Sequence, residues 1–218
     1  MSEQKQNPAD IAKHLRKPEG AQGLKIGEFM NKGNASMYAG VRKHLPELLG
    51  QRLLEIGFGN GVTSKEIMRQ TQYTGLDYSA DMVAAAESLC AAEVQQNGAR
   101  FVHGDIHQMP FEAGSFDMVF TINTIYFWDD APAAAAELKR VLKSGGQLFI
   151  GMRTKEDMDL LSAITQHGFI LRPLLEVEAL LREAGFTNLS YTVYPDPLRP
   201  DMQGRMVQLH TVVFSAVA

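Results

Sequence analysis

Three glycines and an acidic residue give the sequence its clearest potential for ligand chemistry. The glycines follow a short apolar segment, residues 53–56, and they are Gly57, Gly59 and Gly61. Glycine has no Cβ, so the chain can turn sharply there and a ligand can lie against bare backbone N–H groups. Asp77 follows about 20 residues later, where an acid can accept hydrogen bonds from both ribose hydroxyls. The pattern indicates a site for an adenosine-bearing ligand.

The glycine spacing differs from the dinucleotide fingerprint. In G-x-G-x-x-G, the third glycine lets the following helix approach the strand closely. Counted from Gly57, that place holds Val62, and the third glycine comes one residue early at Gly61. The turn therefore suits an adenosyl ligand and is not an obvious dinucleotide site.

The elements that would position these residues alternate between strand and helix. Apolar segments bounded by turns predict strands at residues 53–56, 73–77, 100–103, 116–122 and 147–152. Helical periodicity predicts helices at 10–17, 35–45, 81–96 and 131–143, one of about three turns after the glycines, and one from 172 to 185. Two final strands, 188–194 and 206–217, flank a proline-rich loop, 195–203. Residues 18–34 are predicted as an irregular loop or broken helix. The pattern alone supports a βα repeat with a hairpin-like end.

Five ordered motifs carry a resemblance to a known family. They are E-x-G-x-G-x-G from residue 55, GLDYSADM, GDIHQMPF, FDMVFTINTIYFW and LKRVLKSGGQLFI. In this order they resemble the class I S-adenosylmethionine-dependent methyltransferases, in the small-molecule branch that includes quinone-biosynthesis enzymes. The resemblance covers roughly residues 50–190. It implies a Rossmann-like α/β fold with a seven-stranded, mostly parallel sheet, helices on both faces and an antiparallel last strand.

The resemblance also implies S-adenosylmethionine as cofactor and a set of residues around it. Glu55 would lie near the amino-acid moiety, Asp77 would bind the ribose, and Asp105 would accept a hydrogen bond from the adenine amino group. The expected cofactor residues are Glu55, Gly57, Gly59, Gly61, Asp77, Tyr78, Asp105, Ile106 and Asn123. Simpler roles stay open, with Glu55 as a solvated strand end, Tyr78 as a half-buried aromatic and Asp105 as a turn residue.

The residues after the fourth strand leave the acid–base chemistry open. Small-molecule relatives carry paired histidines where this chain has Tyr126 and Phe127, and unperturbed tyrosine, with a pKa near 10, is a poor base. Their aromatic faces would instead stabilise a cationic or flat group, or simply pack. The weak catalytic candidates are Tyr126 and His167, and the substrate candidates are Tyr38, Tyr126, Trp128 and Arg153. Arg153 would bind an anionic substrate or be a solvated loop residue.

Composition limits the class of protein. The 218 residues, 45% of them hydrophobic, suit one α/β domain at residues 47–218 with an N-terminal helical or lid segment at residues 1–46. The net charge of −4 argues against a nucleic-acid partner. Cys90 is the only cysteine, which excludes an internal disulfide and a cysteine-based zinc cluster. We expect no bound metal, no integral membrane segment and a cytoplasmic location.

The predicted function is methyl transfer from S-adenosylmethionine to the O, N or C atom of a small-molecule acceptor. One alternative is a non-catalytic protein that binds the same adenosyl ligand. The other is a nicotinamide-dependent oxidoreductase, against which Val62 and the lack of a Tyr-x-x-x-Lys pair both speak. The sequence predicts neither the acceptor, nor a general base, nor the oligomeric state.

Overall fold

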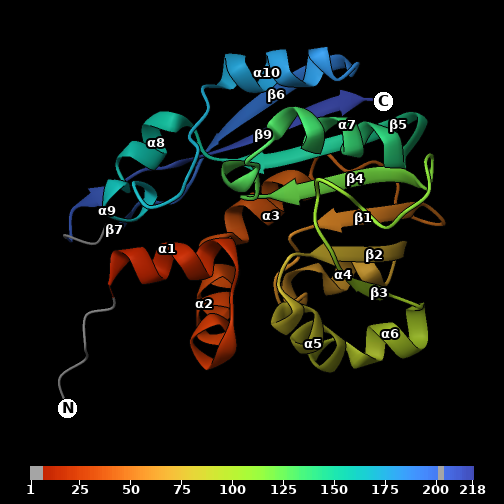
Figure 1. Cartoon of the computed structure of the whole chain (residues 1–218), viewed down its shortest axis with the longest axis horizontal. Helices are drawn as coiled ribbons and strands as arrows, with labels where there is room; N and C mark the ends of the chain where they lie inside the picture. The colour runs from red at the N-terminus through yellow and green to blue at the C-terminus, as the bar shows by residue number, and fades with distance from the viewer. Residues whose placement is uncertain (1–6, 201–203) are drawn as a thin grey trace.

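A computed structural model describes residues 7–200 and 204–218 of the chain, and its core is one seven-stranded sheet (Figure 1). The strand order is β3-β2-β1-β4-β5-β9-β6. Its strands are β1 (Arg52–Ile56), β2 (Gln72–Asp77), β3 (Arg100–His103), β4 (Phe116–Ile122), β5 (Leu142–Met152), β6 (Thr187–Pro195) and β9 (His210–Val217). Two short strands, β7 (Arg199–Pro200) and β8 (Met206–Val207), pair separately.

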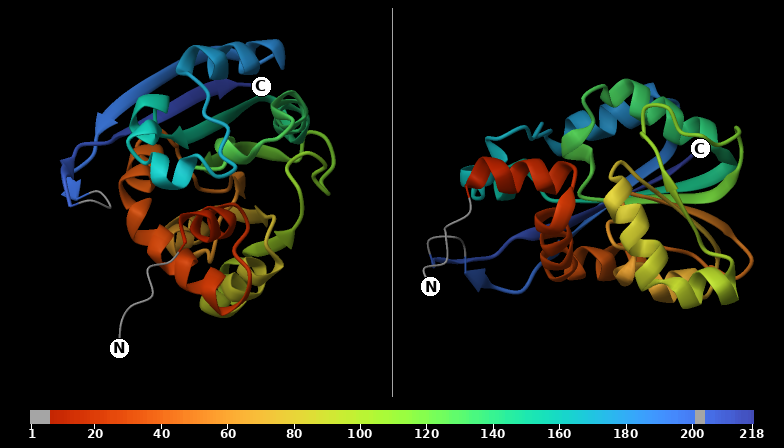
Figure 2. Two further views of the ribbon diagram at one scale, coloured as in Figure 1. Left: turned by 60° about the vertical axis from the view of Figure 1, so that its left-hand side comes forward. Right: turned by 60° about the horizontal axis from the view of Figure 1, so that its bottom comes forward.

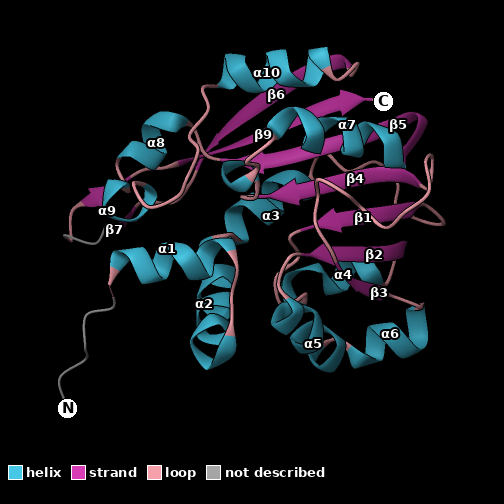
Figure 3. Ribbon diagram, viewed as in Figure 1, coloured by secondary structure: helices cyan, strands magenta, loops and turns pink. Residues whose placement is uncertain are grey.

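The sheet is parallel except at one strand. β1 pairs in parallel with β2 and β4, whereas β9 runs antiparallel between β5 and β6. This arrangement confirms the predicted Rossmann-like fold with its antiparallel last strand. The arrowheads of β1, β2 and β4 point toward the N-terminal helices, and that of β9 points the opposite way (Figure 3). The carboxyl ends of the parallel strands, where such folds bind ligands, therefore meet the N-terminal segment.

The helices flank this sheet. They are α1 (Pro8–Arg16), α2 (Gly20–Gly33), α3 (Ala35–Arg42), α4 (Lys65–Met68), α5 (Ala80–Leu89), α6 (Ala91–Asn97), α7 (Ala131–Val141), α8 (Lys155–Asp159), α9 (Ser162–Thr165) and α10 (Leu174–Glu183), with 3-10 turns η1 (Val62–Ser64) and η2 (Ile125–Phe127). The right-hand view of Figure 2 places α1 and α2, drawn in red, at one end of the sheet. Within the described residues, no helix is long and apolar enough to cross a membrane.

Apolar side chains cover both faces of the sheet, because neighbouring residues of a strand point to opposite faces. In β4, Val119 belongs to a cluster that includes Leu138 of α7 and Leu181 of α10. Phe120 belongs to the other cluster, with Val41 of α3 and Met68 of α4. Burial on both faces explains why the strands read as nearly continuous apolar runs.

The N-terminal segment differs from the prediction. Residues 18–34 contain the regular helix α2 rather than an irregular loop. Two of its glycines, Gly23 and Gly27, gave a misleading signal because they allow close packing. A Cβ at Gly23 would collide with Pro18, and one at Gly27 would press on Met82 of α5. Tertiary contact therefore outweighs the low helix propensity of glycine.

Two other predicted helices are shorter than expected. The helix after the glycine turn is one turn of α4, because the Thr71 hydroxyl donates to the Ile67 carbonyl and β2 begins directly afterwards. The helix predicted at 81–96 is divided at Cys90 into α5 and α6. Asp130 caps the start of α7, since its side chain accepts a hydrogen bond from the Ala133 N–H at 3.0 Å. Part of the predicted loop 195–203 lies outside the described residues.

Candidate functional site

The glycine turn borders a cavity at the carboxyl ends of β1, β2 and β4, which we call the glycine-turn cavity. Its floor includes Gly57, Gly59, Asp77 and Asn123. Gly57, Gly59 and Gly61 have φ values of 71°, 60° and 73°, a conformation that L side chains rarely adopt. A Cβ at Gly61 would contact Cys90, Ala86 and Phe101, whereas a Cβ at Gly59 would meet nothing within 4 Å. Gly59 thus leaves its backbone open to a ligand, and Gly61 serves packing.

Asp77 lies at the end of β2 with only 8% of its surface exposed. Its two carboxylate oxygens accept hydrogen bonds from the backbone N–H groups of Gly59 and Ser79, each at 2.9 Å. Burial raises the pKa of Asp77 to about 6, although these two hydrogen bonds oppose the shift. A carboxylate has about four acceptor positions, so about two remain for a ligand.

Glu55 does not line this cavity. Its carboxylate accepts hydrogen bonds from the hydroxyls of Tyr38 at 2.6 Å and Tyr73 at 2.7 Å, and from Ser64. Burial raises its pKa. Glu55 is therefore not the solvated strand end that the sequence left open. Three hydroxyl donors already surround it, so its predicted contact with a ligand would have to act through Tyr38, which does line the cavity.

Tyr78, Asp105 and Ile106 also line the glycine-turn cavity. Tyr78 is half exposed, and the Lys17 ammonium lies 5.2 Å from its ring centroid. Oδ1 of Asp105 lies 2.6 Å from Nδ1 of His107. Nε2 of His107 is buried without a hydrogen-bond partner and also borders the cavity. His107 is not among the cofactor residues expected from the sequence, so its place in this wall was missed.

Asn123 lies where the glycine-turn cavity meets a second cavity. Its φ of 58° is unusual for a residue other than glycine and marks local strain at the end of β4. Its side-chain N–H donates to Oδ1 of Asn34 at 2.9 Å, while its own Oδ1 is buried without a partner. An unpaired, buried acceptor at this junction is available to a ligand.

The second cavity, which we call the apolar cavity, lies between the N-terminal helices, η2, α8 and α9. It shares Leu15, Met30, Asn34, Asn123 and Phe127 with the glycine-turn cavity. Of the substrate candidates, Tyr126 and Arg153 line the apolar cavity, whereas Tyr38 and Trp128 line the glycine-turn cavity. The structure therefore divides the predicted substrate residues between two adjoining spaces.

Neither catalytic candidate is placed to act as a base. The Tyr126 hydroxyl accepts a hydrogen bond from the Arg153 N–H at 2.6 Å and donates to the Arg153 carbonyl at 3.3 Å. Burial raises its pKa further. His167 is exposed in the turn after α9 and borders neither cavity. The geometry therefore gives Tyr126 a structural role and places His167 away from both cavities.

Arg153 is not a solvated loop residue. It is 3% exposed, and its Nη1 lies 2.8 Å from Oδ2 of Asp196 and 3.3 Å from the His210 carbonyl oxygen. Burial and this ion pair keep the guanidinium at the edge of the apolar cavity. Its other terminal nitrogen, Nη2, is buried without a hydrogen-bond partner.

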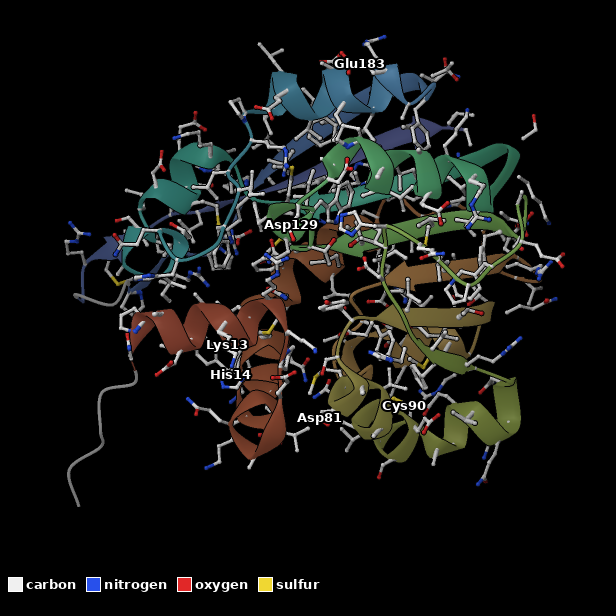
Figure 4. The ribbon with its side chains drawn as sticks, in the orientation of Figure 1. Lys13, His14, Asp81, Cys90, Asp129 and Glu183 are labelled. Atoms are coloured by element: carbon white, nitrogen blue, oxygen red, sulfur yellow. The ribbon has the colours of Figure 1, made fainter. Side chains whose placement is uncertain are left out.

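The N-terminal helices cross the entrance of the glycine-turn cavity. Arg16, at the end of α1, forms a two-pronged ion pair with Asp129, in which Nη1 donates to Oδ1 at 3.1 Å. The Gly20 N–H donates to Asp81 at 2.6 Å, and Ser79 donates to the Pro18 carbonyl. Figure 4 labels Asp81 beside the start of α2 and Asp129 close to α1. The sequence missed Arg16 and Asp129 because 113 residues separate them.

Comparisons with known proteins agree with this geometry. The family profile described as "Methyltransferase domain" matches residues 54–150. These residues run from β1 into β5 and include the glycine turn, Asp77 and Asn123. Residues 54–150 are therefore similar to the methyltransferase domain family.

Curated proteins similar to this chain are also named as methyltransferases. The chain is 33% identical over 128 residues to phthiotriol/phenolphthiotriol dimycocerosates methyltransferase 1 of Mycobacterium ulcerans, covering 57% of this chain and 45% of that protein. It is 28% identical over 182 residues to the O-methyltransferase resE of Aspergillus sclerotiorum, covering 79% of this chain and 69% of that protein. The chain spans about half the length of the first curated relatives it matches.

A solved structure shares the methyltransferase fold. Phosphoethanolamine N-methyltransferase 2 of Haemonchus contortus, in complex with phosphomonomethylethanolamine and S-adenosylhomocysteine, superimposes with a TM-score of 0.70 at 18% identity. The match covers 95% of this chain and 60% of that one. At this identity the likeness concerns the fold.

The glycine-turn cavity fits the adenosyl cofactor that this domain family implies. A Cβ at Gly59 would meet no protein atom, and Asp77 retains free acceptor positions near it. Asn123 lines both cavities and has a buried side-chain oxygen without a hydrogen-bond partner. Among residues 7–200 and 204–218, no three His, Cys, Asp or Glu side chains gather closely enough to hold a metal ion.

Proposed function

We propose that the protein transfers a methyl group from S-adenosylmethionine to a small molecule bound in the apolar cavity. One observation carries the proposal, namely that the two cavities meet at Asn123. A methyl donor bound in the glycine-turn cavity and a methyl acceptor bound in the apolar cavity would therefore lie next to each other at Asn123. This arrangement would hold the two reactants close together in a fixed orientation. Such positioning is most of what methyl transfer needs from a protein.

When bound, S-adenosylmethionine supplies a methyl group already activated by positively charged sulfur. The residues of the chain would then bind and orient it. Asp77 would accept hydrogen bonds from the ribose hydroxyls, and the backbone around Gly59 would lie against the ligand. Asp105 and Ile106 would hold the adenine, and the free oxygen of Asn123 would face the reacting end.

The described lining of the apolar cavity offers no carboxylate or imidazole to take a proton from the methyl acceptor. Among the described residues that line the apolar cavity there is no Asp, Glu or His. We infer that the protein positions the acceptor and excludes water, and that any proton leaves to solvent or has left before binding. This arrangement suits a nucleophile that is already ionised or that carries a free lone pair.

Isothermal titration calorimetry with S-adenosylhomocysteine and, separately, with NADH tests the proposal. We expect heat with the former and none with the latter. Heat with NADH alone would favour the oxidoreductase alternative. Acceptor screening with a labelled methyl donor then separates an enzyme from a protein that only binds the cofactor, because only an enzyme would transfer the label.

We expect cofactor binding to release protons near pH 6. The pKa of Asp77 is raised to about 6 by burial, and hydrogen bonds from ribose hydroxyls would lower it again by favouring the carboxylate. Affinity for S-adenosylhomocysteine should therefore fall as the pH drops below about 6. Calorimetry at pH 6 in buffers of different ionisation enthalpy measures the protons released. Asp77→Asn should abolish this component; if it does not, the protons come from a group other than Asp77.

Asp77 should also affect the stability of the unliganded protein. Its carboxyl group holds a proton more tightly in the folded than in the unfolded chain. Its contribution to the free energy of unfolding therefore falls as the pH rises from about 4 through 6. Chemical denaturation of the protein and of Asp77→Asn across this range would measure the difference.

We expect Arg16→Gln to speed the release of S-adenosylhomocysteine. The Arg16–Asp129 ion pair connects α1 to the rim of the glycine-turn cavity, but both side chains are largely exposed and screened by water. The effect should be about 2- to 5-fold, the scale of an exposed pair with favourable geometry. Stopped-flow release measures it, and added salt should produce the same change in the unmodified protein. An unchanged release rate would show that α1 does not retain the ligand.

Two broader proposals rest on composition. The net charge of −4 favours a small-molecule acceptor over nucleic acid. The single cysteine, Cys90, is buried and unpaired, which suits a reducing cytoplasm.

A further inference from the structure

We propose that the acceptor has an apolar body and one anionic group, and that Arg153 and Arg199 bind this group inside the apolar cavity. The inference rests on the proposed function, because it takes this cavity to be the acceptor site. It adds a class of substrate, namely apolar or aromatic carboxylates and similar anions.

The walls of the cavity fit the apolar part of such a molecule. Phe127 and Phe169 lie with their ring centroids 4.7 Å apart, and Met158 and Ile164 contribute aliphatic surface. Phe29 of α2 borders the same space and is 72% exposed. A large apolar side chain so exposed at the rim of a cavity indicates a surface that a ligand covers.

Arg153 provides the first polar contact. It is 3% exposed and borders the cavity, and its Nη2 is buried without a hydrogen-bond partner. A buried donor on a charged group costs stability unless something accepts from it. The ion pair with Asp196 uses Nη1, so Nη2 remains for an acceptor atom from a ligand.

Arg199 of β7 provides a second positive charge in the same cavity. Burial lowers its pKa, and the neighbouring Arg153 lowers it further, while Asp196 acts in the opposite direction. Asp196 is already engaged by Arg153 and by the Thr211 hydroxyl at 2.7 Å. Among the described residues, the Asp196 carboxylate forms an ion pair with Arg153 and also acts electrostatically on Arg199. A bound anion would relieve the repulsion between the two arginines and accept from both.

Binding of matched acids and amides tests the proposal. The probes are 4-hydroxycinnamate and octanoate, each compared with its neutral amide by calorimetry, with and without S-adenosylhomocysteine. In the unmodified protein we expect at least one acid to bind about tenfold or more tightly than its amide. In Arg199→Gln this preference should fall to less than about threefold, because one charge-assisted contact is lost.

A matched control and a second variant keep the result interpretable. Arg182→Gln removes a guanidinium that pairs with Glu178 on the outside of α10 and borders neither cavity, so it should retain the preference. Because Arg153 is buried in an ion pair, Arg153→Lys is preferable to its removal. The lysine keeps the charge but has no second planar donor, so it should weaken both acids while the amides bind as before.

The outcomes separate this inference from the proposed function. Equal affinity for acid and amide, no binding of either acid, or a preference that survives in Arg199→Gln would overturn the inference. S-adenosylhomocysteine binding without acid preference would refute the inference alone. Acid preference without S-adenosylhomocysteine binding would refute the proposed function and leave an anion site in this cavity.

Discussion

Gly59→Val should weaken S-adenosylhomocysteine binding by about 100-fold or more, because the new side chain would occupy the space of the ligand. A Cβ at Gly59 meets nothing within 4 Å in the protein, so the fold has room for it and the ligand does not. The φ of 60° adds a backbone cost of about 1–2 kcal/mol, which lowers stability without unfolding a domain of ordinary stability. Calorimetry measures the affinity, and thermal unfolding measures the cost.

Gly50→Val is the matched control for this experiment. Gly50 has a φ of 75° and nothing within 4 Å of its Cβ position, but it precedes β1 and borders neither cavity. The same backbone strain should therefore lower the melting temperature and leave S-adenosylhomocysteine affinity unchanged. If Gly59→Val bound the ligand as well as Gly50→Val does, the ligand would not lie against this backbone.

Asp77→Ala should weaken S-adenosylhomocysteine binding by about 1–3 kcal/mol, the scale of lost hydrogen bonds to a charged group. Part of the loss is indirect, since Asp77 also holds the N–H groups of Gly59 and Ser79. Asp77→Asn separates the two effects, because an amide oxygen can replace one acceptor but not both. Calorimetry on both variants should place Asn between Asp and Ala.

Asp117→Ala is the control for Asp77→Ala, because it also removes a carboxylate that accepts a hydrogen bond from a backbone N–H. Asp117 of β4 accepts from the Arg52 N–H at 2.9 Å and pairs with Lys143, at the opposite end of the sheet from Asp77. Its removal should lower stability while affinity stays the same. Equal losses of affinity in the two alanine variants would mean that Asp77 acts through folding rather than through the ribose.

The fold could be predicted from the sequence wherever neighbouring residues alone determine an element. Apolar runs ending in turn residues located β1, β2, β3 and β4 to within a residue or two, because a strand buried on both faces needs little context. The segment containing α2 could not be predicted, since its glycines act through contact with Pro18 and Met82. Helix propensity describes an isolated chain, and those contacts exist only after folding.

The same distinction applies to the candidate site. Gly59, Asp77 and Asn123 lie at or just after the carboxyl ends of β1, β2 and β4, which are neighbours in the sheet, and the structure brings them to one cavity. The position of Glu55 was also accessible in principle. Residues alternate along β1, which places Glu55 on the face of Leu53 and Tyr73, under the sheet rather than in the turn. The pairs Arg16–Asp129 and Arg153–Asp196 had no local signal, because each joins separate elements.

The position of β9 has a consequence for biosynthesis. This strand lies between β5 and β6, and both of its neighbours precede it in the chain. A nascent polypeptide therefore cannot complete its sheet until residues 210–217 have emerged from the ribosome. Until then β5 and β6 each present unpaired backbone groups, so the interval before β9 inserts is when the protein is most exposed to aggregation.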